Sequence, residues 1–274
     1  MEHFYIITNS HKDQNLEKTN YIRDYLERHH KKCTVQVKEE AGKRHYTDSA
    51  NIPSDVDCIL VLGGDGTLLE AARDTVSRDI PLLGINLGTL GYLAEVEEAG
   101  LDAALNQLME NKYEIEQRMM LTGKVVRGEI HVRMHEEKGV GHYEIEESYA
   151  LNDIAITRSG SLQIIRFQVY VNGQFLNEYQ ADGVIVATPT GSTGYNLSAG
   201  GPIVEPKAEL LLVTPICPHT LNTRSIILAP WDKVEIQIGT GHEESIQQVE
   251  VNFDGSHKLT LYTGDKVEIE KAVI

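Results

Sequence analysis

The order of apolar and polar residues predicts strands that alternate with helices over the first third of the chain. Short apolar runs are typical of buried strands, and apolar residues at helical spacing are typical of helices that cover a sheet. Strands joined by helices indicate a parallel sheet with crossover helices. The predicted strands are 3–8, 33–37, 57–64 and 80–86, the predicted helices are 12–30, 66–77 and 97–111, and 38–56 is a predicted polar loop.

From about residue 112 the pattern changes to many short strands. We therefore expect an α/β domain over 1–111 and an all-β domain over 112–274. The pair Asn172-Gly173 lies between two alternating strands and predicts a type I′ hairpin, in which both central residues need a positive φ. The predicted strands are 113–116, 121–134, 142–157, 162–171, 174–179, 183–188, 225–229, 233–239, 246–253, 257–262 and 266–270.

Charge and cysteine content narrow the classes of partner. The 274 residues carry a formal net charge of −16, which disfavours binding to nucleic acid or to an anionic membrane. An anionic ligand would then need backbone N–H groups, local cations or a metal at its site. Cys33, Cys58 and Cys217 are far apart, and the N-terminus lacks the features of a signal peptide, so we expect a cytoplasmic protein.

The sequence Gly63-Gly64-Asp65-Gly66 follows a predicted buried strand and precedes a predicted helix. Glycines at that place let phosphate oxygens approach backbone N–H groups, but an aspartate repels phosphate. Asp65 is therefore a candidate general base for a hydroxyl, a magnesium ligand, or both. A structural alternative is a strand-to-helix turn in which Asp65 or Thr67 caps the helix. The motif matches neither a P-loop nor the full dinucleotide fingerprint.

Two further glycine-rich segments follow strands. In "GINLGTLGYLAE" (84–95), Gly88 and Gly91 would let the loop pack beside the first turn. In 181–204, six hydroxyl side chains lie among five glycines, which suits ribose and phosphate oxygens, and Tyr195 offers a flat face for a base. Asn152-Asp153 could pair with donors and acceptors of a nucleobase or a carboxamide, or form an Asx turn. "FDG" (253–255) says little alone.

These motifs in this order resemble the NAD kinase family. The resemblance runs from about residue 57 to 256, and although lipid kinases share GGDGT, they lack the long 181–204 motif. The matching segments are Gly63-Gly64-Asp65-Gly66-Thr67, Asn86-Leu87-Gly88-Thr89-Leu90-Gly91-Tyr92, Asn152-Asp153, Asp182-Gly183, Thr188-Pro189-Thr190-Gly191-Ser192-Thr193 and Phe253-Asp254-Gly255.

The resemblance implies a Rossmann-like α/β domain, a sandwich-like β domain, and phosphoryl transfer from ATP or polyphosphate to the adenosine 2′-hydroxyl of NAD, giving NADP. It implies that Asp65 is the base and that the chain forms a homodimer or homotetramer. Because few cations lie near the motifs, we expect magnesium to neutralise charge on the phosphate donor. Arg73 could reach the donor or lie on a solvated face. The implied dinucleotide contacts are Asp65, Gly66, Asn152, Asp153, Asp182, Thr193, Gly194, Tyr195, Asn196, Leu197 and Ser198.

Two other functions compete with this interpretation. A lipid or sphingoid kinase would use the same GGDGT turn, but it would need a basic or apolar surface facing the membrane, and the net charge argues against one. A dinucleotide-binding sensor without activity would keep 181–204 but would not need Asp65. The sequence leaves the phosphate donor, the choice between NAD and NADH, and the regulation open.

Overall fold

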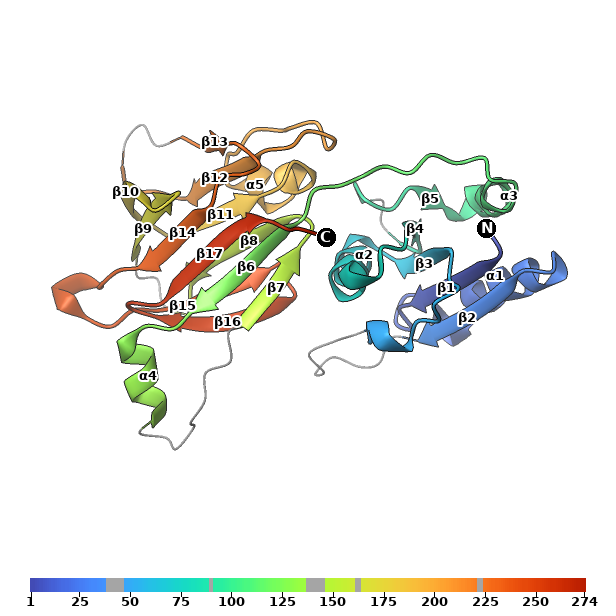
Figure 1. The fold of residues 1–274 in the computed structure, drawn as a ribbon, viewed down its shortest axis with the longest axis horizontal. Helices are drawn as coiled ribbons and strands as arrows, with labels where there is room; N and C mark the ends of the chain where they lie inside the picture. Colours follow the sequence, from blue (N-terminus) through green and yellow to red (C-terminus); the bar gives the residue numbers. More distant parts are fainter. Residues whose placement is uncertain (38–46, 89–90, 137–145, 161–163, 221–223) are drawn as a thin grey trace. The chain divides into compact units, whose positions relative to one another are not determined.

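The computed structural model describes residues 1–37, 47–88, 91–136, 146–160, 164–220 and 224–274 (Figure 1). Contacts divide the chain into two compact units, Met1–Glu116 with Ile274 (unit 1) and Gln117–Val273 (unit 2). Residues 38–46 of the predicted polar loop at 38–56 lie outside the described residues, as do Thr89 and Leu90 of the second glycine-rich segment.

Unit 1 is built on a five-stranded sheet in the order β2-β1-β3-β4-β5, and every neighbouring pair is parallel. The parallel sheet with helices confirms the α/β prediction. Short 3-10 turns occur at Gln14–Leu16, Ser49–Asn51, Val76–Arg78 and Glu98–Gly100. The strands are β1 (His3–Thr8), β2 (Lys32–Val37), β3 (Cys58–Gly63), β4 (Leu82–Asn86) and β5 (Val96–Glu97), and the helices are α1 (Glu17–Arg28), α2 (Asp65–Thr75) and α3 (Leu101–Met109).

The helices of unit 1 cover both faces of the sheet. Phe4 and Ile6 of β1 belong to a buried cluster with Ile22 and Leu26 of α1 and the leucines of α3. The alternate residues of β1 belong to a second cluster, with Leu68 and Ala71 of α2. The chain therefore changes faces between the helix after β1 and the helix after β3. In sheets of this strand order, ligands bind at the carboxyl ends of those two strands.

Unit 2 consists of two six-stranded antiparallel sheets, in the orders β10-β9-β14-β17-β6-β7 and β13-β12-β11-β8-β15-β16. Short 3-10 turns lie at Thr190–Thr193 and His242–Glu244. The strands are β6 (Leu121–Val126), β7 (Glu146–Ala150), β8 (Asp153–Arg158), β9 (Ile165–Val171), β10 (Gln174–Ala181), β11 (Gly183–Ala187), β12 (Leu211–Ile216), β13 (Ile226–Leu228), β14 (Val234–Ile238), β15 (Gln248–Phe253), β16 (His257–Tyr262) and β17 (Lys266–Lys271), with helices α4 (Glu129–Glu136) and α5 (Tyr195–Ser198).

One apolar core joins the two sheets of unit 2. It contains Phe167 of β9 and Ile236 of β14 from one sheet, and Val184 of β11 and Phe253 of β15 from the other. This arrangement confirms the predicted mostly-β, sandwich-like fold. The predicted hairpin is also confirmed, because Asn172 and Gly173 have φ of 52° and 74° and connect β9 to β10.

Several strand predictions are wrong. The single strand predicted over 142–157 is interrupted at 151–152, where the Asp254 carboxylate accepts hydrogen bonds from the backbone and separates β7 from β8. The two-residue strand β5 was not predicted. The predicted strand at 113–116 is irregular, and Ile115 is exposed, so the alternating pattern there has no sheet to cover. The predicted strand 121–134 ends at Val126 and is followed by helix α4. Strand β12 was missed. β12 contains Pro215, and proline is uncommon inside a strand because it has no N–H to donate to a neighbouring strand. The proline is tolerated here because β13 pairs with β12 only at Leu211–Val213, which leaves Pro215 beyond that pairing.

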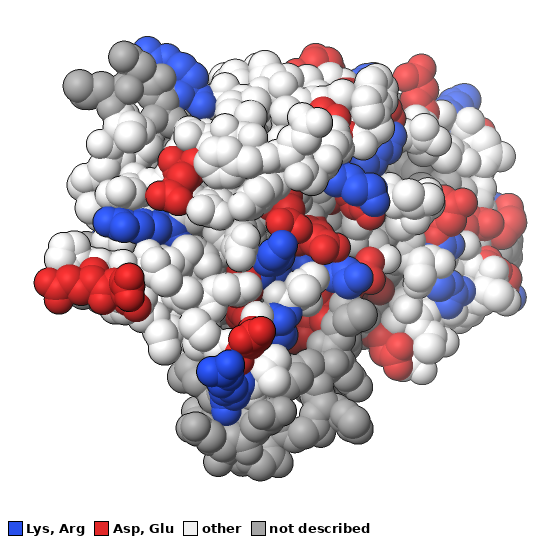
Figure 2. Space-filling view, turned by 60° about the vertical axis from the view of Figure 1, so that its left-hand side comes forward, with Lys and Arg blue, Asp and Glu red and all other residues white. Residues whose placement is uncertain are grey.

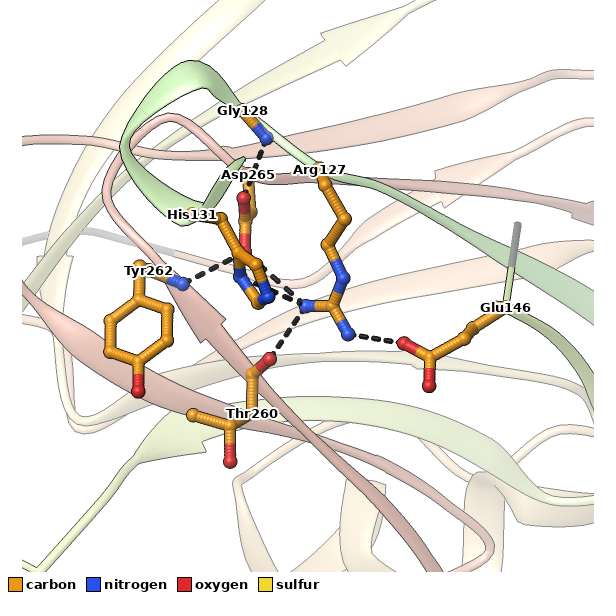
Figure 3. A network of polar contacts seen from close by, with 7 residues as sticks. All are labelled: Arg127, Gly128, His131, Glu146, Thr260, Tyr262 and Asp265. Carbon is orange, nitrogen blue, oxygen red and sulfur yellow. Dashed lines mark hydrogen bonds and ion pairs between the residues drawn. The ribbon is translucent and has the colours of Figure 1, made fainter. Parts of the chain in front are cut away.

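A buried polar network explains why β6 gives way to α4 (Figure 3). The fully buried Asp265 carboxylate accepts hydrogen bonds from the backbone N–H groups of Gly128, at 2.7 Å, and Tyr262, at 3.0 Å. The Nδ1 of His131 lies 2.8 Å from the same carboxylate, and Arg127 donates to it and to Glu146. These contacts hold the backbone at 127–131 in a turn, so the strand cannot continue.

No helix among the described residues is long and apolar enough to cross a membrane. All three cysteines are free thiols. Burial raises the pKa of Cys33 and of Cys58 to about 12, which keeps both thiols protonated and unreactive at neutral pH.

We predict that Asp265→Asn lowers the free energy of unfolding by about 3–5 kcal/mol, because the amide presents an NH₂ group to donors and leaves Arg127 without its buried partner. Urea unfolding followed by circular dichroism measures this loss. The matched control Glu268→Gln, on an exposed position of β17, should change stability by less than about 0.5 kcal/mol. Equal stability of the two variants would contradict a structural role for the network.

Candidate functional site

Asp65 is the first residue of α2, but its carboxylate does not cap the helix. Gly64 occupies the N-cap position, and the cap has no side-chain hydrogen bond. The Asp65 carboxylate instead accepts hydrogen bonds from the backbone N–H of Tyr92, at 2.9 Å to Oδ2, and of Leu93, at 3.2 Å to Oδ1. The helix-capping alternative is therefore wrong. Each carboxylate oxygen keeps a further lone pair for another donor.

The two glycine-rich turns of unit 1 pack against each other. The N–H of Leu87 donates to the carbonyl of Gly63 at 2.9 Å, which joins the end of β4 to the end of β3. A Cβ atom on Gly91 would lie 2.1 Å from Oδ1 of Asp65, so only glycine lets the second turn approach the carboxylate. Gly66, the next residue of α2, has no atom within 4 Å of its Cβ position and borders open space.

Arg73 fits neither interpretation left open by the sequence. Its side chain is buried, and its guanidinium donates to the buried carboxylate of Asp74 at 3.1 Å. It is therefore neither on a solvated face nor free to meet a phosphate. No group of three or more His, Cys, Asp or Glu side chains in the described part of the chain is arranged to hold a metal ion.

In unit 2, the turn at 151–153 contacts the hydroxyl-rich segment 188–198. The Thr188 N–H donates to the Asn152 carbonyl at 2.9 Å, and the Thr188 hydroxyl donates to the Leu151 carbonyl at 2.6 Å. A Cβ atom on Gly191 would lie 2.1 Å from the same Asn152 carbonyl. The two motifs, far apart in sequence, thus form one surface. Thr193, Gly194, Tyr195, Leu197 and Ser198 are exposed or half-buried on it.

Asn196 differs from its neighbours, because it is completely buried. Its amide nitrogen donates to the carbonyls of Ser192, at 3.3 Å, and Pro202, at 3.2 Å. Its amide oxygen accepts from the Thr214 hydroxyl at 2.7 Å. The side chain therefore uses its hydrogen-bonding capacity inside the protein and holds the segment on β12.

Asp254 positions the turn that carries Asn152 and Asp153. Its carboxylate accepts hydrogen bonds from the backbone N–H groups of Leu151 and Asn152, both at 2.8 Å, and of Asp153, at 3.0 Å. Asp254 itself has φ of 49°, in the left-handed region, and its N–H donates to the Asp153 carbonyl at 3.0 Å. The sequence interpretation gave Asp254 no role, although the "FDG" turn was the available signal.

Asp153 lies buried beside this arrangement, and no other described residue forms a hydrogen bond with its carboxyl group. Burial, with the nearby negative charge of Asp254 as a second cause, raises the pKa of Asp153 to about 7. The side-chain oxygen of Asn152 is also buried without a hydrogen-bond partner among the described residues. Buried polar groups of this kind are typical of binding sites.

Asp182 lies at the opposite end of the β8 and β11 pair from Asp153, because Gly183 pairs with Thr157 whereas Ala187 pairs with Asp153. Asp182 follows β10, and its carboxylate is 3.7 Å from a guanidinium nitrogen of Arg158. The pKa of Tyr195 is raised by burial and, to a smaller extent, by the negative charges of Asp153, Cys217 and Asp182. Unit 2 therefore offers carboxyl, amide and aromatic groups on one surface.

Comparison with known proteins gives consistent matches over the whole chain. Residues 4–113 match the family described as ATP-NAD kinase N-terminal domain, and residues 151–273 match the ATP-NAD kinase C-terminal domain. The NAD kinase of Lachnoclostridium phytofermentans is 47% identical over 99% of this chain and 91% of that protein. The NAD kinase of Agathobacter rectalis is 46% identical over the same shares of the two chains.

Solved structures agree with the fold. The crystal structure of yeast NADH kinase complexed with NADH has a TM-score of 0.82 at 26% identity, over 100% of this chain and 79% of that chain. An NAD kinase from Archaeoglobus fulgidus in complex with ATP has a TM-score of 0.72 at 24% identity, over 98% of this chain and 90% of that chain. At that identity, the second likeness supports the fold alone.

We predict that Asp153 makes stability fall as pH rises from about 4 to about 7. The native carboxyl, with a pKa of about 7, keeps a proton that the unfolded chain, with a pKa near 3.9, has already lost, so ionisation favours unfolding. Between pH 5 and pH 8, wild type should lose about 1–3 kcal/mol more unfolding free energy than Asp153→Asn. Urea unfolding at both pH values tests this, and parallel pH profiles would contradict it.

Proposed function

The chain belongs to the NAD kinase family, and we propose that Asp65 is the base through which it phosphorylates NAD. The observation that carries this role is the orientation of the Asp65 carboxylate, which two backbone N–H groups hold away from the helix cap. A carboxylate fixed in this way can accept a further hydrogen bond from a hydroxyl without reorganising.

In the proposed reaction, the 2′-hydroxyl oxygen of the adenosine ribose attacks the terminal phosphorus of ATP or polyphosphate. A bond forms between that oxygen and the phosphorus, and the bond from the phosphorus to the bridging oxygen breaks. The bridging oxygen keeps the electron pair and leaves with the shortened donor, and the hydroxyl proton passes to Asp65. The transition state is loose, so alignment and charge neutralisation provide most of the catalysis.

We propose that the surface of unit 2 binds the dinucleotide. The buried carboxyl group of Asp153 and the unpartnered oxygen of Asn152 support contacts with polar edges of the ligand, and the exposed ring of Tyr195 supports stacking on a base. Asn196 supports this surface from inside rather than contacting the ligand with its side chain. The remaining proposed contacts are Gly66 of unit 1 and Asp182, Thr193, Gly194, Leu197 and Ser198 of unit 2.

Magnesium fits the chemistry of unit 1. Mg²⁺ is commonly bound by one or two carboxylates together with substrate phosphates and water, so it does not need a cluster of protein ligands. Asp65 is the carboxylate that the described residues place in the first glycine-rich turn, and we propose it as the protein group nearest the metal. When bound, Mg²⁺ would neutralise charge that develops on the donor phosphates.

We further propose that the protein is cytoplasmic, self-associates as a homodimer or homotetramer, and has small molecules rather than nucleic acid or membrane as its ligands. The face in Figure 2 carries interspersed acidic and basic side chains rather than an extended basic patch, in keeping with the net charge of −16. Phe175, Leu176 and Trp231 of unit 2 are exposed apolar residues, which supports self-association.

Asp65→Asn should lower kcat by about 10²- to 10⁴-fold, because the amide cannot accept the hydroxyl proton. The affinity for NAD should stay within about twofold, since most proposed contacts lie in unit 2. Steady-state kinetics and calorimetric titration with NAD measure the two effects.

Asp79→Asn is the matched control, because Asp79 is an exposed aspartate of unit 1 with φ of 47°, a conformation that asparagine tolerates. It should keep wild-type kinetics. An Asp65→Asn enzyme that binds NAD and turns over at the wild-type rate would rule out Asp65 as the base.

A donor assay tests the activity itself. Purified protein is incubated with NAD, Mg²⁺ and either ATP or polyphosphate, and the product is followed with an NADP-specific dehydrogenase. We expect NADP from at least one donor. If neither donor gives NADP although NAD binds, the result favours the alternative of a dinucleotide-binding sensor without activity.

A further inference from the structure

We propose that Lys12 binds the phosphates of the donor, a role that rests on the proposed function of the glycine-rich turns. Lys12 follows β1 and was not singled out by the sequence motifs. A Cβ atom on Gly64 would lie 2.6 Å from the Lys12 ammonium nitrogen, and one on Gly88 would lie 3.9 Å from it. The ammonium group therefore lies over both turns, beside the start of α2, and helix N-termini that follow glycine-rich turns commonly bind anions.

The turn after β1 fixes the backbone of Lys12. The N–H of Asn9 donates to the Leu62 carbonyl at 3.1 Å, and the N–H groups of Lys12 and Asp13 donate to the Asn9 carbonyl at 2.9 and 3.0 Å. The buried Asp13 carboxylate accepts hydrogen bonds from Lys18 N–H, at 2.9 Å, and Thr19 N–H, at 2.8 Å, at the start of α1. Hydrogen bonds thus hold the backbone on both sides of Lys12.

The charge of Lys12 is available to a ligand. The structure shows no hydrogen bond or ion pair from its ammonium group to any other described residue, and the side chain is exposed. Arg73, the cation considered from the sequence, already pairs with Asp74. In a protein of net charge −16, a lysine that points at two glycine turns without an acidic partner is suited to a polyanionic ligand.

The position of Lys12 at the end of β1 also supports a role in binding phosphate. Lys12 follows β1 and Gly64 follows β3, and these two neighbouring strands mark the point where the helices change faces. Thr8, the last residue of β1, has a fully buried hydroxyl without a hydrogen-bond partner among the described residues. A polar group left unpaired at this strand end is a second sign of a ligand site.

We therefore assign different roles to Lys12 and Asp65. Lys12 attracts the phosphates of ATP or polyphosphate, whereas Asp65 serves the acceptor hydroxyl. A lysine ammonium acts as a point charge and suits a chain of phosphates without demanding one geometry. Lys12 is therefore expected to affect binding of either donor and to leave NAD binding unchanged.

The test compares wild type with Lys12→Gln, Lys12→Arg and Lys32→Gln. We expect Lys12→Gln to raise the Kd for ATP and for inorganic tripolyphosphate, measured by calorimetry without NAD, by about 10- to 100-fold. The donor KM should rise in parallel, and the KM for NAD should stay within about twofold. Lys12→Arg should restore most of the donor affinity, because it restores the positive charge.

Lys32 is an exposed lysine of unit 1 that pairs with Asp55, so Lys32→Gln controls for the loss of one positive charge and should bind donor as wild type does. Circular dichroism confirms that each variant is folded. Donor binding by Lys12→Gln equal to that of wild type would overturn the proposal. If wild type gives no NADP with either donor, the proposed function fails instead, while the calorimetric comparison still decides whether Lys12 binds phosphate.

Discussion

The contact on which the site of unit 1 depends is a carboxylate held by backbone N–H groups. Asp65 stands at the positive end of α2, where a capping role would be ordinary, yet Tyr92 and Leu93 draw its carboxylate to the neighbouring turn. Gly91 makes this possible by having no side chain. One local interaction thus joins two segments and leaves lone pairs of a fixed carboxylate for a ligand. Unit 2 also contains a carboxylate held by backbone N–H groups, because Asp254 accepts hydrogen bonds from three consecutive N–H groups.

An acidic protein that binds anionic ligands must provide favourable charge locally. In unit 1, the ends of β1 and β3 bring the Lys12 ammonium group beside two glycine-rich turns. In unit 2, burial and Asp254 hold the pKa of Asp153 near neutrality, so this residue adds less negative charge than an exposed aspartate would. Both effects reduce repulsion where a dinucleotide or a phosphate chain would lie, while the net charge of −16 stays spread over the surface.

Sequence patterns predicted elements well where local chemistry and tertiary contacts agree. Asn172-Gly173 formed its hairpin because both residues accept positive φ, and Leu101, Leu105 and Leu108 are buried on one face of α3 as their spacing indicates. Prediction failed where distant residues decide. The strand expected through residue 134 stops because Asp265, far along the chain, captures the N–H of Gly128. β12 was missed because only the fold shows that its proline lies beyond the pairing with β13.

The sequence alone determined the α/β and β organisation, the family, and the residue types of the site, because strand periodicity, glycine turns and the order of motifs are local properties of the chain. Tertiary structure decided how those residues are used. It directed the Asp65 carboxylate away from the helix, buried Asn196, and placed Lys12 over two turns. Each of these outcomes depends on contacts between segments distant in sequence, and no local pattern encodes such contacts.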